Sequence, residues 1–136
     1  MKEAILVDSN VLLDIITHDH VWGDWAYDTL LQLVDEYRPA INSIIYAEIS
    51  IRFSTIRELE NAVSISFFER LPVPYEAAFL AGKCYMRYKE RGGLKTSVLP
   101  DFFIGAHALV SNMQLLTRDV SRYKTYFPNL KLIYPG

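Results

Sequence analysis

Two acidic residues follow closely on short aliphatic segments of this sequence. Asp8 comes directly after the apolar run 5–7, and Asp119 lies two residues beyond the segment 115–117. If both segments are parallel strands of one open sheet, the two carboxylates meet at its carboxyl edge, where the working cleft of such sheets lies. Each acid also has a plainer interpretation, as the N-terminal cap of the helix that follows it.

Two further acids fall within segments of helical periodicity. Glu48 lies four residues after Ile44 and three before Ile51, which places a carboxylate in the apolar stripe of its helix. An unpaired carboxylate there is costly, so either Arg52 or a bound cation is expected to neutralise it. Asp101 shares the apolar face of the next-to-last helix, although a first-turn acid is also favoured by the helix dipole alone.

Four carboxylates at one sheet edge form a hard-oxygen donor set of the kind that binds Mg²⁺ or Mn²⁺. The single cysteine, Cys84, is expected in a helix core and leaves no Cys-based zinc site. A divalent ion would relieve the repulsion among the acids, lower the pKa of a bound water and neutralise charge on a phosphate under in-line attack. The pattern therefore favours a divalent-metal site at this edge of the sheet.

The elements that must position these acids alternate along the chain. Aliphatic runs predict strands at 4–7, 40–42, 114–117 and 130–133 and an extended segment at 71–74. Helical spacing predicts helices at 11–16, 22–37, 43–53, 56–69, 77–90, 100–110 and 120–126. Pro39 is expected to stop the second helix and Ser43 to cap the third. Alternating strands and helices indicate an α/β fold, a three-layer α/β/α sandwich with a central parallel sheet.

Length and composition indicate a single domain over residues 1–136. The chain has 136 residues, 51% of them hydrophobic, enough for a sizeable core and too many for a disordered protein. Its longest apolar runs are far below the roughly 20 residues of a membrane helix. The first residues include Glu3 and Asp8 and lack the apolar centre of a signal peptide, so we expect a cytoplasmic protein with no membrane contact.

Charge is distributed unevenly between the two halves. Residues 1–68 hold 4 basic and 11 acidic side chains, whereas residues 69–136 hold 10 and 5. A basic run beside a Gly-Gly loop is a candidate site for RNA phosphates, with solvated surface as the plainer reading: Lys83, Arg87, Lys89, Arg91 and Lys95. Tyr85, Tyr88 and Tyr123 are candidate platforms for stacked bases, although aromatic residues at helical spacing more often belong to the core.

Four short motifs, in order, carry a family resemblance. They are Asp-Ser-Asn-Val-Leu-Leu-Asp at 8–14, Ser43 with Glu48-Ile49, Asp-Phe-Phe-Ile-Gly-Ala-His-Ala at 101–108, and Leu-Thr-Arg-Asp at 116–119. Together they resemble the PIN domain, and among PIN domains the VapC-like toxin ribonucleases of type II toxin–antitoxin systems. The resemblance spans essentially the whole chain.

The resemblance implies a metal-dependent endoribonuclease that leaves a 5′-phosphate and a 3′-hydroxyl. It assigns Mg²⁺ or Mn²⁺ to the acidic quartet, namely Asp8, Glu48, Asp101 and Asp119. Side chains that orient the carboxylates and water would be Ser9, Asn10, Ser43 and Thr117. Family members often carry another acid where this chain has Ser121, which argues against a second tightly held metal.

The resemblance also implies protein partners. It assigns an amphipathic antitoxin segment to an apolar groove, and the aromatic and aliphatic residues nearest to the expected site are Trp22, Trp25, Ile45, Ile49 and Phe53. A homodimer contact or simple core packing would account for the same residues.

Other functions share parts of this pattern. A receiver-like, Mg²⁺-binding phosphoacceptor or regulatory module also gathers acids at a parallel sheet edge, but it needs paired acids after the first strand, where Asp8 stands alone. A phosphohydrolase with a catalytic Asp-x-Asp is disfavoured because Asn10 occupies the second position. A non-toxin PIN-fold ribonuclease and an inactive PIN-like scaffold would carry every motif.

Overall fold

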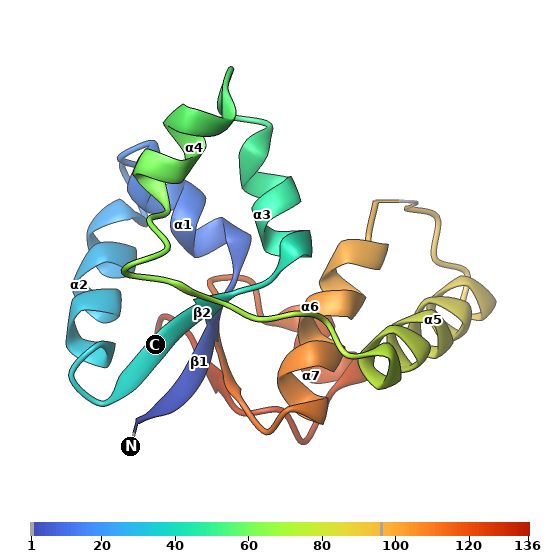
Figure 1. The fold of residues 1–136 in the computed structure, drawn as a ribbon. Coiled ribbons are helices and arrows are strands. Elements are labelled where there is room, and N and C mark those ends of the chain that lie inside the picture. The colour runs from blue at the N-terminus through green and yellow to red at the C-terminus, as the bar shows by residue number, and fades with distance from the viewer. Residues whose placement is uncertain (1, 96) are drawn as a thin grey trace.

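A five-stranded parallel sheet forms the centre of the protein. The computed structural model describes residues 2–95 and 97–136. The strand order is β3-β2-β1-β4-β5, and every neighbouring pair is parallel (Figure 1). The strands are β1 (Glu3–Val7), β2 (Tyr37–Ile41), β3 (Glu69–Arg70), β4 (Gln114–Leu116) and β5 (Leu132–Ile133). Because the strands are parallel, their carboxyl ends share one edge of the sheet.

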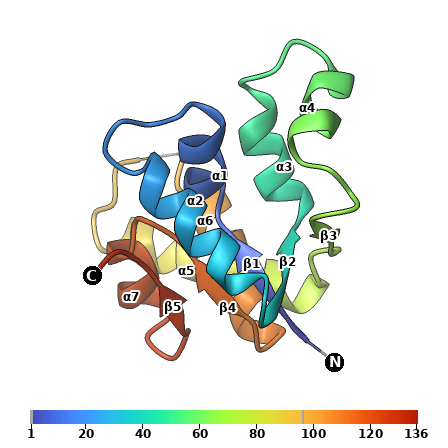
Figure 2. The ribbon, with the colours of Figure 1, turned by 90° about the vertical axis from the view of Figure 1, so that its left-hand side faces the viewer.

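Helices cover both faces of this sheet. They are α1 (Ser9–Ile16), α2 (Gly23–Leu33), α3 (Ser43–Ser50), α4 (Ile56–Ala62), α5 (Tyr75–Glu90), α6 (Leu99–Val110) and α7 (Ser121–Tyr126). Helices α1 and α2 lie on one face and α5 and α6 on the other, while α3 and α4 stand above the carboxyl end of β2 (Figures 1 and 2). The predicted three-layer α/β/α sandwich is confirmed.

The central strand explains why the sheet needs two helix layers. Ile5, Leu6 and Val7 of β1 are fully buried, so apolar side chains on both faces of the strand are covered. Phe102 of α6 and Cys84 of α5 are equally buried beneath one face. Cys84 is a small residue of the helix core, as expected.

The prediction for residues 22–41 was wrong in its boundaries. Helix α2 ends at Leu33, and Tyr37 to Ile41 form β2, so Pro39 lies inside a strand instead of ending a helix. Strand β3 pairs only with Ala40 and Ile41 of β2. At Pro39 the strand therefore has a neighbour on one side only, a position that tolerates a residue without an N–H group.

Two other local predictions are corrected. Helix α3 is capped by Asn42, whose side chain accepts a hydrogen bond from the Ile45 N–H at 2.9 Å, and Ser43 is the first helical residue. The helix predicted over 56–69 ends at Ala62, and Glu69 and Arg70 form the edge strand β3. Asn42 also contacts the buried ring of His107 at 2.9 Å, which joins the end of β2 to α6.

None of the described helices is long and apolar enough to cross a membrane.

Candidate active site

Asp8 lies at the carboxyl end of β1 and caps α1. The residue is 3% exposed, and both carboxylate oxygens are hydrogen-bonded. Oδ1 accepts from the Ser9 backbone N–H at 2.8 Å, while Oδ2 accepts from the hydroxyls of Thr117 at 2.8 Å and Tyr123 at 2.9 Å. The capping role and the candidate catalytic role therefore coexist in one side chain.

Ser9 links Asp8 to Glu48. Its hydroxyl donates to Glu48 Oε1 at 2.8 Å and lies 3.4 Å from Asp8 Oδ1. This contact brings the first turn of α1 against α3. Arg52, the alternative partner for Glu48 considered from sequence, is exposed and forms no ion pair with it among the described residues.

Asp101 lies in the first turn of α6, half-buried, and meets a basic residue. Its Oδ2 accepts a hydrogen bond from Arg122 Nη1 of α7 at 2.6 Å. Asp119 lies between β4 and α7 and is exposed. The Asp119 backbone N–H donates to Thr117 Oγ1 at 3.2 Å. Thr117 thus connects the turn that carries Asp119 to the Asp8 carboxylate.

Burial and neighbouring negative charge raise the pKa values of three of the four acids. Burial raises the pKa of Asp8 from 3.8 to about 6, and the charges of Asp101 and Glu48 add to the rise. Burial also raises the pKa of Glu48, with a contribution from the charge of Asp101. For Asp101, burial raises the pKa and the charge of Asp119 adds to it, whereas Arg122 opposes the rise. Removing a group from water and placing like charges nearby both disfavour the ionised carboxylate.

The donor chemistry of the quartet fits a hard divalent cation. All four candidate ligands are carboxylates, and three of them have raised pKa values that a cation would lower. Within residues 2–95 and 97–136, no three Asp, Glu, His or Cys side chains are already arranged as a metal-binding group. The Asp8 oxygens are engaged by hydroxyl and backbone donors, and Asp101 faces Arg122. Asp101 Oδ2 must therefore exchange its guanidinium partner if that oxygen is to bind a metal ion.

The side chains predicted to orient the acids divide into two groups. Ser9 and Thr117 donate to quartet carboxylates, and Asn10 donates to Thr117 Oγ1 at 3.2 Å while accepting from the Arg118 backbone N–H at 3.2 Å. Ser43 is exposed, and its hydroxyl forms no hydrogen bond to the quartet in the part of the chain described.

Sequence reasoning did not identify the partners of the acids in this region. Tyr123 was weighed as a base-stacking platform or a core residue; it is 2% exposed and its hydroxyl donates to Asp8, so the core interpretation is confirmed. Arg122 was not singled out. Arg118 and buried Asp14 form an ion pair at 2.6 Å that fastens the turn after β4 to α1. The 8–14 motif contains Asp14, but nothing in its spacing identifies an arginine 104 residues away as its partner.

The predicted basic run lies on the exposed side of α5 and on the loop that follows. Lys83 contacts the ring of Phe79, with its nitrogen 5.2 Å from the ring centre, and Arg87 contacts Cys84. Arg91 stacks over Tyr126, with its guanidinium carbon 5.4 Å from the ring centre. Lys95 is the member of the run whose charge lowers the pKa of Asp101.

The predicted apolar groove is corrected by the packing of α3. Ile45 and Ile49 are fully buried and belong to the core, so they offer no surface to a partner. Trp22, Trp25 and Phe53 are half-buried.

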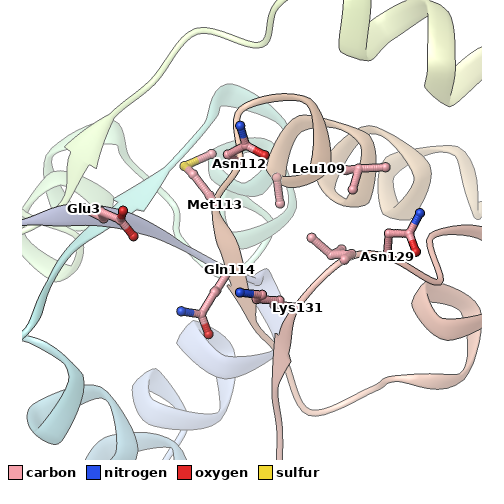
Figure 3. Close-up of a pocket in the computed structure, with 9 residues that line it drawn as sticks. Glu3, Leu109, Asn112, Met113, Gln114, Asn129 and Lys131 are labelled. Atoms are coloured by element: carbon pink, nitrogen blue, oxygen red, sulfur yellow. The ribbon is translucent and has the colours of Figure 1, made fainter.

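A polar pocket elsewhere in the protein is distinct from the quartet. It has a volume of about 260 Å³ and is lined by residues that include Glu3, Gln114 and Lys131 (Figure 3). These residues begin or precede β1, β4 and β5, so the pocket lies at the amino edge of the sheet, opposite to Asp8.

Comparisons with known proteins agree with this architecture. A family model described as PIN domain matches residues 5–128, which is most of the chain. The search of curated proteins found no significant match. Among solved structures, VapBC2 from Rickettsia felis bound to a promoter DNA fragment has a TM-score of 0.74 at 21% identity, covering 98% of this chain and 99% of that one.

Two other solved structures are similar. A toxin–antitoxin complex from Klebsiella pneumoniae matches with a TM-score of 0.66 at 20% identity, covering 98% of each chain. VapBC-1 from nontypeable Haemophilus influenzae matches with a TM-score of 0.72 at 18% identity, covering 96% of this chain and 97% of that one. At such identities these structures share the fold, and the family model, which spans the strands and helices carrying the quartet, establishes that this chain belongs to the PIN domain family.

Proposed function

We propose that this protein is a divalent-metal-dependent endoribonuclease and the toxin of a toxin–antitoxin pair. Membership of the PIN domain family supports a nuclease that acts on nucleic acid. The observation that carries the proposal is the gathering of buried or half-buried acids near the carboxyl edge of the sheet. Burial raises the pKa values of Asp8, Glu48 and Asp101, and each of the three is raised further by the charge of at least one other quartet acid. Such a concentration of destabilised negative charge favours Mg²⁺ or Mn²⁺.

The proposed ligands are Asp8, Glu48, Asp101 and Asp119, with direct or water-mediated contacts to the metal. A bound divalent ion supplies a water of lowered pKa and neutralises charge on the scissile phosphate. The residues of this chain hold the carboxylates in place for it. Thr117 and Tyr123 fix Asp8 Oδ2, which leaves Asp8 no freedom to turn away, and Ser9 orients Glu48.

The basic run is the proposed path for the RNA backbone. Lys83, Arg87, Lys89, Arg91 and Lys95 follow α5 into the loop that leads to Asp101. The charge of Lys95 lowers the pKa of Asp101, which supports a path that runs from the basic run towards the acidic quartet. Contacts to backbone phosphates bind RNA of any sequence. A preference for particular bases must therefore come from other parts of the surface.

The antitoxin partner is proposed from the solved structures of the same fold, one described as a toxin–antitoxin complex and others as VapBC. This chain offers an apolar groove of about 320 Å³ between α1, α2 and the end of α4. Its rim carries three exposed apolar side chains, Tyr27, Leu31 and Phe67. A helical antitoxin segment with apolar residues on one face fits such a groove. A homodimer is also proposed.

A non-catalytic PIN-fold scaffold is the competing function. The ion pair between Arg122 and Asp101 favours it, because an arginine already neutralises one of the four acids. The receiver-like alternative has lost its support. Receiver-type sheets run in the order 2-1-3-4-5, whereas this sheet runs β3-β2-β1-β4-β5 and matches the PIN domain.

The test is cleavage of a mixed-sequence, 5′-labelled single-stranded RNA in Mg²⁺, Mn²⁺ or EDTA. We expect cleavage in either metal and none in EDTA. Asp101→Asn should lower the rate by at least about 100-fold, equivalent to about 3 kcal/mol of transition-state stabilisation. Asp28→Asn, which alters an exposed acid of α2, serves as the matched control. A wild-type protein that is folded yet cleaves no RNA would favour the scaffold.

A further inference from the structure

We propose that Arg122 is a positioning residue that couples metal binding to RNA binding. It neutralises Asp101 before the metal ion enters, and it contacts an RNA phosphate once the metal has taken Asp101 from it. This inference rests on the proposed ribonuclease function and assigns to that site a residue that the four acidic motifs do not include.

Among the described residues, Arg122 is the only basic side chain that forms an ion pair with a quartet acid. The described residues form four ion pairs, and those of Arg38, Arg70 and Arg118 involve acids outside the quartet. Arg122 Nη1 lies 2.6 Å from Asp101 Oδ2, and the two side chains are 21% and 31% exposed. The pair is therefore partly shielded from solvent but remains open to a ligand arriving from outside.

An aromatic cluster holds the guanidinium at this position. The guanidinium carbon of Arg122 lies 5.7 Å from the centre of the Tyr88 ring. Tyr88 packs edge-to-face against Phe102 and Tyr126, with ring centres 5.9 Å and 6.4 Å away. These rings belong to α5, α6 and α7, so the guanidinium is supported even without the contact to Asp101.

The same cluster joins Arg122 to the basic run. Arg91 stacks on Tyr126, and the Tyr88 hydroxyl accepts a hydrogen bond from the Lys95 backbone N–H at 3.2 Å. Arg91 and Arg122 thus lie on neighbouring rings of one platform, between the exposed loop and the acids. An RNA backbone that follows the basic run to the quartet passes this platform.

The chemistry of the two partners explains the coupling. A carboxylate that is already bound to a guanidinium binds a metal ion less tightly, because the metal competes with a charge-assisted hydrogen bond for the same negative charge. The displaced guanidinium retains its charge and its planar pair of donors, which match a phosphodiester. Metal binding therefore improves the site for RNA, and by linkage RNA binding improves the site for metal.

The experiment measures Mn²⁺ affinity by titration calorimetry without RNA. Arg122→Gln should bind Mn²⁺ about 10-fold more tightly than the wild type, since no guanidinium competes for Asp101. Arg122→Met, which keeps an aliphatic stem over Tyr88, should do the same. Arg122→Lys should stay near the wild-type affinity because it retains the charge. Arg38→Gln, which removes an ion pair with Glu69 at the amino end of β2, should leave Mn²⁺ affinity unchanged.

A second measurement follows RNA binding by fluorescence anisotropy of a labelled, mixed-sequence single-stranded RNA, with and without Ca²⁺. Gel analysis of the same samples confirms that the probe stays intact. Ca²⁺ should strengthen RNA binding by the wild type, and Arg122→Gln should reduce this enhancement by at least about 5-fold. A purely structural ion pair would lower the melting temperature of the variants without moving either affinity.

The outcomes separate this inference from the proposed function. If the wild type cleaves RNA and folded Arg122→Gln and Arg122→Met bind Mn²⁺ no more tightly than it does, the role of Arg122 is overturned and the ribonuclease stands. If neither the wild type nor these variants bind Mn²⁺ or cleave RNA, both proposals are overturned.

Discussion

At the scale of single residues, Asp8 shows how burial and hydrogen bonding oppose each other. Three groups donate hydrogen bonds to its oxygens, and these bonds favour the charged form. Burial outweighs them, so the pKa rises from 3.8 to about 6. In the absence of metal the folded protein therefore holds a proton on Asp8 more tightly than the unfolded chain does.

The first prediction concerns the pH dependence of stability in EDTA. Because the folded-state pKa of Asp8 is raised, its stabilising contribution is complete below about pH 4, is lost as the pH rises to about 6, and is constant above that. The difference in unfolding free energy between the wild type and Asp8→Asn should therefore fall by about 3 kcal/mol over that range. Urea denaturation of both proteins from pH 4 to 7.5 measures it. A difference that does not vary with pH contradicts the environment assigned to Asp8.

At the scale of elements, the contact between α6 and α7 determines where Tyr123 can reach Asp8. Gly105 of α6 allows this close approach. A Cβ atom at Gly105 would lie 2.5 Å from Cε2 of buried Phe127 and 3.1 Å from Cδ1 of Tyr123. The absence of a side chain at this position therefore supports the hydrogen bond from Tyr123 to Asp8.

The second prediction is that Gly105→Ala destabilises the protein. The clash should cost about 1–3 kcal/mol even though alanine favours a helix. Gly82→Ala on α5 is the matched control: nothing lies within 4 Å of its Cβ position, so this variant should gain about 0.5–1 kcal/mol. Urea denaturation compares the two. If both substitutions stabilise the protein equally, the result contradicts close packing of α6 against α7 at Gly105.

The third prediction concerns the end of α5 and the loop after it. Replacing Lys89 and Arg91 with alanine removes two charges that lie outside the acidic quartet. The slope of log affinity for single-stranded RNA against log salt should become shallower by about 1.4, which corresponds to two lost phosphate contacts. The matched control replaces Arg52 and Arg57 with alanine. Both residues are exposed and belong to the acidic half of the chain, so this double variant should keep the wild-type slope. An unchanged slope for the first variant would make the basic run ordinary solvated surface.

At the scale of the whole molecule, the two candidate partner surfaces are made by different layers. The basic run belongs to α5 and its following loop, whereas the apolar groove lies between α1, α2 and the end of α4. Helices α2 and α5 cover opposite faces of the sheet (Figures 1 and 2). A partner in the groove therefore leaves the proposed RNA path accessible unless it also extends across the carboxyl edge.

The fourth prediction tests the groove with a candidate antitoxin, defined as a protein that inhibits RNA cleavage by the wild type. Leu31→Asp and Phe67→Asp place a charge on the rim of the groove and should weaken complex formation by at least about 10-fold without changing RNA cleavage. Tyr75→Asp, at an exposed apolar residue that begins α5, is the control. Calorimetry and a cleavage assay report the two properties. Full inhibition of the Leu31 and Phe67 variants would exclude this groove as the antitoxin site.

Local signals in the sequence located strands β1, β2, β4 and β5 to within a few residues, and with them the sheet edge that carries Asp8 and Asp119. The aliphatic run at 5–7 marks a strand buried on both faces, and parallel strands necessarily bring Asp8 and Asp119 to one edge. Glu48 and Asp101 stand out because each interrupts an apolar helix face. All these signals depend on residues close to one another in the chain.

Contacts between distant segments were decided only by the tertiary structure. Tyr123 and Asp8 are 115 residues apart, and Arg122 and Asp101 are 21 apart on different helices, so no periodicity relates them. The same limit explains why the groove prediction failed for Ile45 and Ile49. They are apolar, as groove residues would be, but they lie inside the core. Apolar spacing shows that a helix has an apolar face, but burial depends on whether a second element covers that face, and hydrogen-bond partners depend on where the chain returns. The candidate acids could therefore be selected from the sequence, whereas the arginine and tyrosine that donate hydrogen bonds to them required the fold.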